Sequence, residues 1–166
     1  MSTPTPLTIT ASDERHRPLL EQLWTMFRHE MSAFTGTLPN EHGRFRQERL
    51  DAGLSKPGWS AQILHLGPHP VGFAVIRGLD TKEHVISSFF IVHGARRSHI
   101  GRAAVTELTA AHPGWWAVAF QDRNEVAANF WRTVATELDR SCTFEQRDVP
   151  GRPELPSDSW VRFCVR

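Results

Sequence analysis

The sequence contains no tyrosine, only two cysteines and only two lysines, and each shortage narrows the chemistry open to the chain. Without tyrosine, no phenol can serve as an acid or a base. Cys142 and Cys164 can form at most one pair, which is no disulfide framework for 166 residues, so we expect two buried free thiols. Because Lys56 and Lys82 are the only lysines, arginine supplies almost all of the positive charge.

Charge and hydropathy exclude several kinds of partner. The formal net charge of +1 gives no general reason to expect nucleic acid or a membrane surface as a partner. No apolar run approaches the ~20 residues that a transmembrane helix needs. Residues 1–16 are polar and lack the basic-then-apolar pattern of a signal peptide. We therefore expect a cytoplasmic protein with one domain over residues 1–166, with no nucleic-acid or membrane partner, and we leave a homodimer open.

Hydrophobic periodicity predicts alternating strands and helices. Alternating or continuous apolar character predicts strands over 7–11, 59–66, 70–77, 84–92, 115–120, 141–147 and 159–166. Helical spacing predicts helices over 19–34, 44–54, 100–112 and 125–138, with Ser12 and Asp13 as caps before the first. The pattern alone is that of a mixed α/β domain.

The segment from residue 84 to 131 carries the strongest functional signal. An apolar strand over 84–92 leads through a turn of glycine and arginine, 94–104, into a helix. Backbone N–H groups at a helix start are unpaired, and the helix dipole favours negative charge there. Arg96 and Arg97 beside the turn would add charge-assisted contacts to a phosphate. The turn is therefore suited to holding an anion.

Two motifs in this segment resemble the GNAT family of acetyl-CoA-dependent N-acetyltransferases, and the short segments 32–36, 71–74 and 89–92 resemble a bacterial subgroup of the small-molecule type. The family pattern Arg/Gln-x-x-Gly-x-Gly/Ala is matched at 96–101, and Asn-x-x-Ala-x-x-Phe-Tyr is matched at 124–131. The order of predicted strands and helices is also that of the family. Two departures stand out, since His99 replaces a glycine and Trp131 replaces the common tyrosine.

The resemblance implies the fold and the cofactor. The expected fold is α/β (α+β), with a central mixed, mostly antiparallel sheet of about seven strands flanked by about four helices. The expected cofactor is acetyl-CoA, with the backbone amides of the turn around its pyrophosphate and the last strand residue paired with its pantetheine arm. The residues that the resemblance assigns to the cofactor are Val92, Arg96, Arg97, Ser98, His99, Ile100, Gly101, Arg102, Ala103, Asn124 and Phe130.

Acyl transfer also needs a group that deprotonates the acceptor, because an alkylammonium has a pKa near ~10. Many family members place a glutamate late on the fourth strand, where this chain has Ser87-Ser88. We predict Glu30 as the base, with Ser88 positioning a water; the neighbouring alternatives are His29, Glu83 and His84. With no tyrosine to protonate it, the CoA thiolate is expected to leave directly, which costs only about 2 kcal/mol at pH 7 for a thiol pKa near ~8.5.

The expected activity is acetyl-CoA-dependent N-acetylation of a small-molecule amine, by direct transfer in a ternary complex. The amine could be an amino acid, an antibiotic-like compound or another specialised metabolite. Two alternatives remain: acetylation of a protein N-terminus or lysine, and a non-catalytic domain that binds acyl-CoA as a sensor or partner module. Arg44 and Arg46 could meet an acidic substrate or form a solvated helix face. The histidine spacings match no zinc pattern, so no metal is expected.

Overall fold

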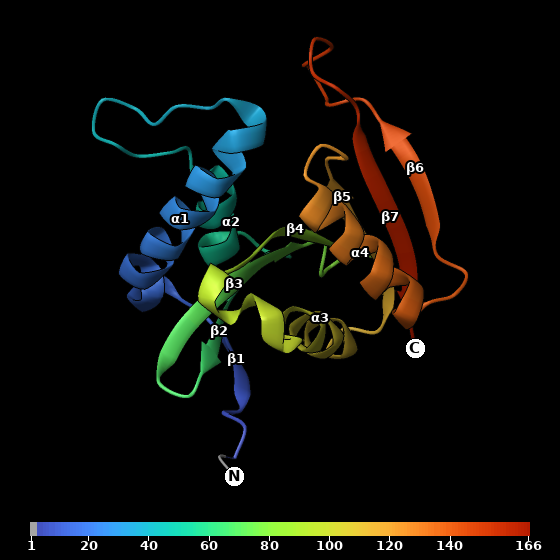
Figure 1. The fold of residues 1–166 in the computed structure, drawn as a ribbon, viewed down its shortest axis with the longest axis horizontal. Helices are drawn as coiled ribbons and strands as arrows, with labels where there is room; N and C mark the ends of the chain where they lie inside the picture. The colour runs from blue at the N-terminus through green and yellow to red at the C-terminus, as the bar shows by residue number, and fades with distance from the viewer. Residues whose placement is uncertain (1–2) are drawn as a thin grey trace.

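One seven-stranded sheet, covered by helices on both faces, makes up the computed structural model, which describes residues 3–166 apart from the Arg97 side chain (Figure 1). The strands are β1 (Leu7–Ala11), β2 (Ser60–Leu66), β3 (His69–Arg77), β4 (Glu83–Ile91), β5 (Gly114–Phe120), β6 (Thr143–Arg147) and β7 (Asp158–Val165). The helices are α1 (Arg17–Thr35), α2 (Glu48–Ser55), α3 (Ile100–Ala110) and α4 (Glu125–Leu138), with short 3₁₀ helices η1 (Glu14–His16) and η2 (His93–Ser98). The predicted fold class is confirmed.

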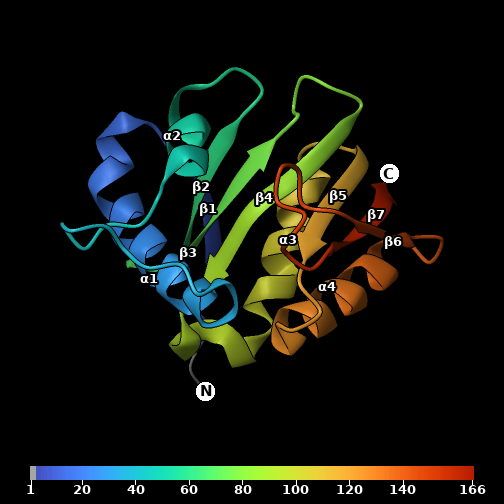
Figure 2. The same ribbon diagram turned by 90° about the horizontal axis from the view of Figure 1, so that it is seen from above.

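The sheet has one pair of parallel strands, and these two strands separate towards their C-terminal ends. The strand order is β1-β2-β3-β4-β5-β7-β6, and β4 with β5 is the only parallel pairing among the described strands. Their register runs from Glu83 opposite Trp115 to Ile86 opposite Val118 and ends there, although β4 continues to Ile91. Figure 2 shows the two ribbons diverging towards their C-terminal ends. The divergence leaves backbone hydrogen-bonding groups of both strands without a neighbouring strand.

Each face of the sheet has its own core. On one face, α1 packs through residues spaced i, i+3, i+4 and i+7, the stripe expected of an amphipathic helix. The buried residues of this face include Leu20, Leu23, Trp24, Phe27, Leu50, Ile63, Phe73, Val75 and Phe90. The other face lies under α3 and α4, and its buried residues include Ile86, Leu108, Trp116, Val118, Trp131, Val134, Val161 and Phe163. Side chains of β4 reach both layers: Ile86 lies in the second and Phe90 in the first, because the pairing with β3 shifts between them.

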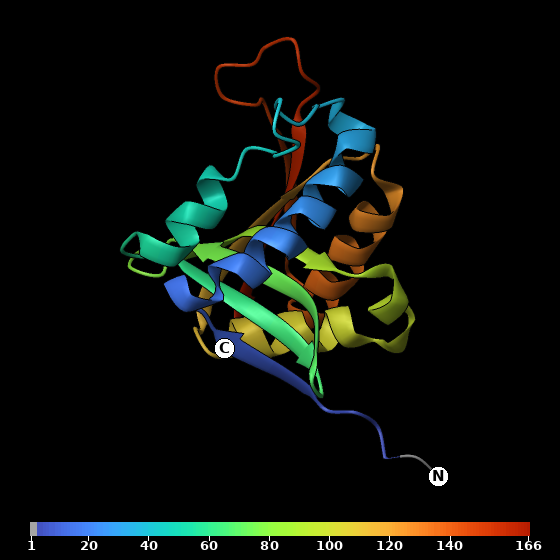
Figure 3. The same ribbon diagram turned by 90° about the vertical axis from the view of Figure 1, so that its left-hand side faces the viewer.

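The second helix begins later than the periodicity predicts. It starts at Glu48 and not at residue 44. The Asn40 side chain accepts the backbone N–H groups of His42 and Arg44, each at 3.0 Å. This local turn competes with helix formation at its own position. The segment before α2 is consequently a loop, and Figures 1 and 3 place the end of α1 and the β6–β7 loop at the same end of the molecule.

The two cysteines are free but less buried than predicted. Cys142 and Cys164 are each only half-buried, so the prediction of buried thiols was too strong. The Cys142 sulfur lies 3.8 Å from the Thr136 hydroxyl. As for the membrane, none of the helices within residues 3–166 is both long enough and apolar enough to cross a bilayer.

Candidate active site between β4 and β5

A β-bulge lies where β4 leaves β5. Ser88 is opposite Val75 and Ile86 is opposite Ile76 on β3, so Ser87 has no residue opposite it. A bulge of this kind bends a strand and redirects its side chains. Ser87 is half-buried, whereas Ser88 is 4% exposed and its hydroxyl has no hydrogen-bond partner among the described residues. The bulge therefore brings Ser87, not the predicted Ser88, to the opening.

A close approach of β3 and β4 decides which backbone groups face the opening. A Cβ on Gly72 would overlap the Phe90 carbonyl oxygen, so that carbonyl points towards β3. The Val92 N–H also points that way, because it donates to the Val71 carbonyl at 2.8 Å. Backbone groups alternate sides along an antiparallel strand, so Phe89 and Ile91 face the gap beside β5. The Val92 N–H, in a residue predicted to pair with the pantetheine arm, therefore points away from the gap.

The start of α3 presents unpaired amides at the end of β4. The first backbone hydrogen bond of the helix is from the Ala103 N–H to the His99 carbonyl, at 3.1 Å. The N–H groups of residues 100–102 precede it and have no acceptor within the helix. They add to the positive end of the helix dipole. The sequence of the turn predicted this arrangement as a site for binding an anion.

The predicted anion turn also depends on an unusual backbone conformation at His99. Its φ of 60° and ψ of 15° place it in the left-handed region, and it is the only non-glycine residue with positive φ in the described chain. Histidine tolerates this region better than most residues, but glycine adopts it without strain. The departure from the family's glycine is therefore accommodated by the same backbone shape.

Replacing His99 with glycine is expected to raise the free energy of unfolding by up to about 1 kcal/mol and to leave CoA affinity nearly unchanged. The reason is that backbone amides, which the substitution keeps, would hold the phosphates. Urea unfolding and calorimetric titration with CoA measure the two effects. His99→Ala is the matched control, since it removes the imidazole and keeps the strain. A loss of CoA affinity in both variants would show that the imidazole itself contacts the cofactor.

Arg96 and Glu30, assigned to the cofactor and to base catalysis by the sequence, bind each other. The Arg96 guanidinium donates to both Glu30 carboxylate oxygens, at 2.7 and 2.8 Å, and its Nε donates to the Ile91 carbonyl at 2.7 Å. The His93 imidazole lies 3.0 Å from the same carboxylate. Such a bidentate pair is among the stronger side-chain contacts. It joins α1 to the end of β4.

Other side chains of the predicted cofactor set also have partners within the protein. The Ser98 hydroxyl donates to the Ala95 carbonyl at 3.2 Å, and Arg102 pairs with Glu137 at 2.7 Å. The Asn124 side chain caps α4 by accepting the Ala127 N–H at 3.2 Å. The Arg97 side chain lies outside the described part of the structure. The predicted cofactor site therefore depends mainly on backbone amides.

Gly101 has a packing role that the motif did not reveal. A Cβ at this position would lie 3.0 Å from the Phe130 ring and 3.4 Å from the Ile91 side chain. Phe130 in turn stacks on Phe89, with ring centroids 5.8 Å apart and planes at 12°. A side chain at this position would therefore crowd the Phe130 ring, and a large substitution there would disturb the packing of α3 against α4.

On the other side of the opening, beside α2, lies a cleft of about 420 Å³. Ser87 from β4 and Ala119 from β5 meet in its wall, so the cleft reaches the seam where the two strands diverge. Its lining residues are Arg49, Trp59, Arg77, Val85, Ile86, Ser87, Ala119, Asp158 and Trp160. The volume is within the range of sites for small molecules.

Three charged residues of the cleft, Arg49, Arg77 and Asp158, were missed by the sequence analysis. Arg49 on α2 donates from Nη1 to the Ser87 carbonyl at 3.0 Å. Asp158 begins β7, and burial raises the pKa of its carboxyl while the Arg49 charge opposes that shift. Asp158 is on the same face of β7 as Trp160, because side chains alternate along a strand. Only the pairing of β5 with β7, which the sequence did not specify, brings this face to the seam.

The alternative base candidates lie elsewhere. His84 is buried against Trp116, on the α3–α4 face, and its Nδ1 is 2.8 Å from the Gly78 carbonyl. Glu83 accepts from Arg162 at 2.5 Å. His29 is exposed on α1. The two arginines considered for an acidic substrate are also paired, Arg44 with Glu21 and Arg46 with Glu48.

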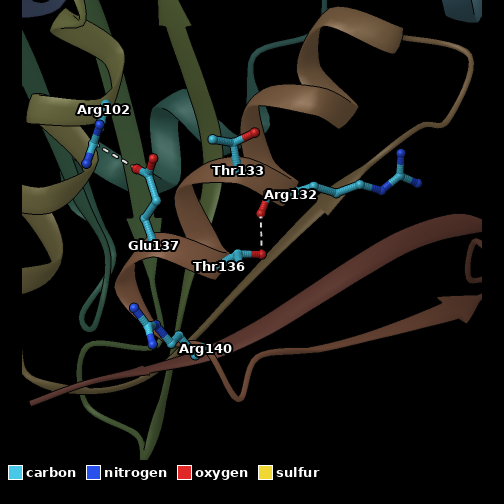
Figure 4. Close-up of a pocket in the computed structure, with 6 residues that line it drawn as sticks. All are labelled: Arg102, Arg132, Thr133, Thr136, Glu137 and Arg140. Atoms are coloured by element: carbon cyan, nitrogen blue, oxygen red, sulfur yellow. Dashed lines mark hydrogen bonds and ion pairs between the residues drawn. The ribbon is translucent and has the colours of Figure 1, made fainter.

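A second hollow is a surface groove of about 750 Å³ between α3 and α4 (Figure 4). Its cations are largely neutralised, since Arg102 pairs with Glu137 and Arg132 pairs with Asp122. The Thr136 hydroxyl donates to the Arg132 carbonyl at 2.7 Å and is not free either. The groove therefore offers fewer uncommitted groups than the opening between β4 and β5.

No protein-family model and no curated protein matches the sequence. Solved structures match its fold. An acetyltransferase from Thermus thermophilus has a TM-score of 0.70 at 17% identity, covering 98% of this chain and 100% of that one. A GNAT-family acetyltransferase from Staphylococcus aureus has a TM-score of 0.66 at 11% identity, and the match covers 97% of this chain and 100% of that one. The ribosomal-protein-S18-alanine N-acetyltransferase from Escherichia coli has a TM-score of 0.63 at 10% identity, and the match covers 96% of this chain and 94% of that one. The chain therefore has the GNAT fold.

Proposed function

We propose that the protein is an acetyl-CoA-dependent N-acetyltransferase that acts on a small-molecule amine. The observation that carries the proposal is the opening between β4 and β5, which has unpaired amides of α3 on one side and a cleft on the other. Fold neighbours named as acetyltransferases support the reaction class. The cleft volume of about 420 Å³ supports a small acceptor.

Most of the contacts to acetyl-CoA would be made by backbone groups. The N–H groups of residues 100–102 suit its pyrophosphate, and the Phe89 backbone and the Ile91 N–H suit its amide-containing arm. The Ile91 carbonyl is already bound to Arg96. Phe130, stacked on Phe89, would pack beside that arm. When bound, acetyl-CoA supplies the acetyl group as a thioester. The N–C bond to the acceptor forms as the C–S bond breaks, and the electron pair of that bond leaves with sulfur.

Asp158 is the carboxylate that we propose as the base. It lines the cleft with Ser87, and no described cation lies within ion-pair distance of it. Burial raises the pKa of its carboxyl, which moves it towards the value that makes a general base effective at neutral pH. The proton lost by the acceptor nitrogen would pass to Asp158, directly or through a water. The thiolate would take its proton from solvent.

Glu30 is proposed instead to position the end of β4. Glu30→Gln is expected to lower the free energy of unfolding by about 1–2 kcal/mol, because an amide cannot make the charged bidentate pair with Arg96. Transfer to an alkyl amine and to an aryl amine should fall by the same modest factor. Glu21→Gln, on the same helix, is the control. If the alkyl amine loses far more rate than the aryl amine, Glu30 is the base and Asp158 is not.

Thiol release from acetyl-CoA over a panel of amines, combined with mass spectrometry of the products, tests the proposed function. Stoichiometric thiol and N-acetylated product are expected with at least one small amine. Tight CoA binding without turnover on any acceptor would favour the binding-module alternative. Turnover confined to peptides and proteins would favour the protein-acetylating alternative.

A further inference from the structure

Two arginines that line the cleft, and a third that lies close enough to act on one of them, lack a carboxylate partner. Arg28 on α1, Arg49 on α2 and Arg77 on β3 make no ion pair within the described part of the chain, whereas most other arginines do. The Arg28 Nε is buried and has no hydrogen-bond partner among the described residues. Arg28 and Arg77 are half-buried, where an unpaired charge is unfavourable, whereas Arg49 is exposed and can be reached by a ligand in the cleft.

The three charges also act on one another. Crowding by protein atoms lowers the pKa of the Arg49 guanidinium, and the positive charges of Arg28 and Arg77 lower it further. Burial likewise lowers the pKa of Arg28, helped by the nearby Arg46 charge. Asp158 and Glu48 oppose the shift at Arg49 but do not abolish it. An anion bound among these groups would relieve the repulsion that they now carry.

Arg49 fixes where that anion would lie. Its Nη1 is hydrogen-bonded to the carbonyl of Ser87, the residue at which β4 bulges away from β5. A guanidinium has five N–H donors, so others remain for a ligand. The acceptor nitrogen must reach the same seam to be acetylated. The anion and the reacting nitrogen would therefore be neighbours.

We propose that the acceptor amine carries a carboxylate a few bonds from its nitrogen, as an amino acid does, and that Arg49 binds this carboxylate with Arg77 beside it. The inference rests on the proposed function. The carboxylate takes no part in bond exchange: the N–C bond forms, the C–S bond breaks and the amine proton goes to Asp158. Polycationic amines are disfavoured at the same site, because their extra charges would face the unpaired arginines.

Matched pairs of amines test the proposal, using the full chain and acetyl-CoA. Each amino acid is compared with its own amide, which has the same body but no carboxylate. The amide's amine is less basic and more often neutral at pH 7, so this bias runs against the proposal. We expect kcat/KM to be about tenfold to a hundredfold higher for the acids, mainly through KM. Amides that react as fast as the acids, or faster, would overturn the proposal.

Variants assign the effect to Arg49. In Arg49→Gln, the acid-to-amide ratio of kcat/KM should fall about tenfold or more, and Arg49→Lys should recover part of it, since the charge is kept but the fork is lost. Arg140→Gln, in the groove between α3 and α4, is the control and should leave the ratio unchanged. An equal ratio in wild type and Arg49→Gln would overturn the role of Arg49.

Three further outcomes are distinguishable. O-phosphoethanolamine, tested alongside the acids, separates a phosphate from a carboxylate; a strong preference for it would overturn the carboxylate assignment and keep the anion site. Absence of thiol release with every amine, together with absence of CoA binding by calorimetry, would overturn the proposed function itself. Efficient transfer to neutral amines alone would overturn only the further inference.

Discussion

Asp158→Asn is expected to lower the rate of acetyl transfer to an alkyl amine by about 10²- to 10⁴-fold, the usual contribution of a general base. Asparagine keeps the size of the side chain and its place in the cleft but cannot accept a proton. The loss should appear in kcat, and it should be smaller for an aryl amine, whose nitrogen is already neutral at pH 7. Asp148→Asn, an exposed neighbour on the β6–β7 loop, is the control.

Asp158→Asn is expected to make the folded protein more stable, although it makes the enzyme less active. Because burial raises the folded-state pKa of Asp158, the folded protein holds this proton at pH values where the unfolded chain has lost it. The free energy of unfolding therefore falls as pH rises from the unfolded-state value through the folded-state value, and the penalty persists at neutral pH. An asparagine side chain has no charge to bury, so Asp158→Asn should unfold at a higher temperature at pH 7. Full activity, or a less stable variant, would contradict the assignment.

Gly72→Ala is expected to destabilise the protein by about 3 kcal/mol or more. The added Cβ would overlap the Phe90 carbonyl oxygen and lie 3.1 Å from the Ile91 Cα, so β3 and β4 would have to separate. Both of these atoms belong to the backbone, and no flexible side chain can yield. For a protein of this size, the midpoint of thermal unfolding should fall by roughly 6–12 °C.

Gly94→Ala provides the comparison, because a Cβ there has nothing within 4 Å. Its stability should stay within about 0.5 kcal/mol of wild type or rise slightly. A loss of less than about 1 kcal/mol in Gly72→Ala would mean that the strands are not so close. The alternation that turns Phe89 and Ile91 towards the opening would then lose its support.

The helices and strands could be predicted from sequence because they are locally encoded, whereas the arrangement of the sheet was predicted only through the family resemblance. The stripe of Leu20, Leu23, Trp24 and Phe27 marks α1, and the strands are short apolar runs between turn residues. The start of α2 was predicted wrongly, since the Asn40 turn depends on side-chain hydrogen bonds that periodicity does not register. Boundaries elsewhere agree to within a few residues.

The candidate site could be predicted only in part. The unpaired amides of α3 follow from a local turn, so a motif could find them. The cleft combines Arg49 from α2 with Asp158 from β7, which are far apart in sequence and meet only through strand pairing. Arg96 and Glu30 were assigned separate roles because nothing local showed that they bind each other across 66 positions. Long-range pairing was therefore the missing information.

A crystal structure of the protein with CoA and an acetylated product tests the central claim most directly. We predict the pyrophosphate on the N–H groups of residues 100–102, the pantetheine arm along Phe89 and Ile91, and the sulfur beside Ser87 with the product in the Arg49–Asp158 cleft. Density for CoA in the α3–α4 groove alone, with the opening between β4 and β5 filled by protein side chains, would contradict this placement.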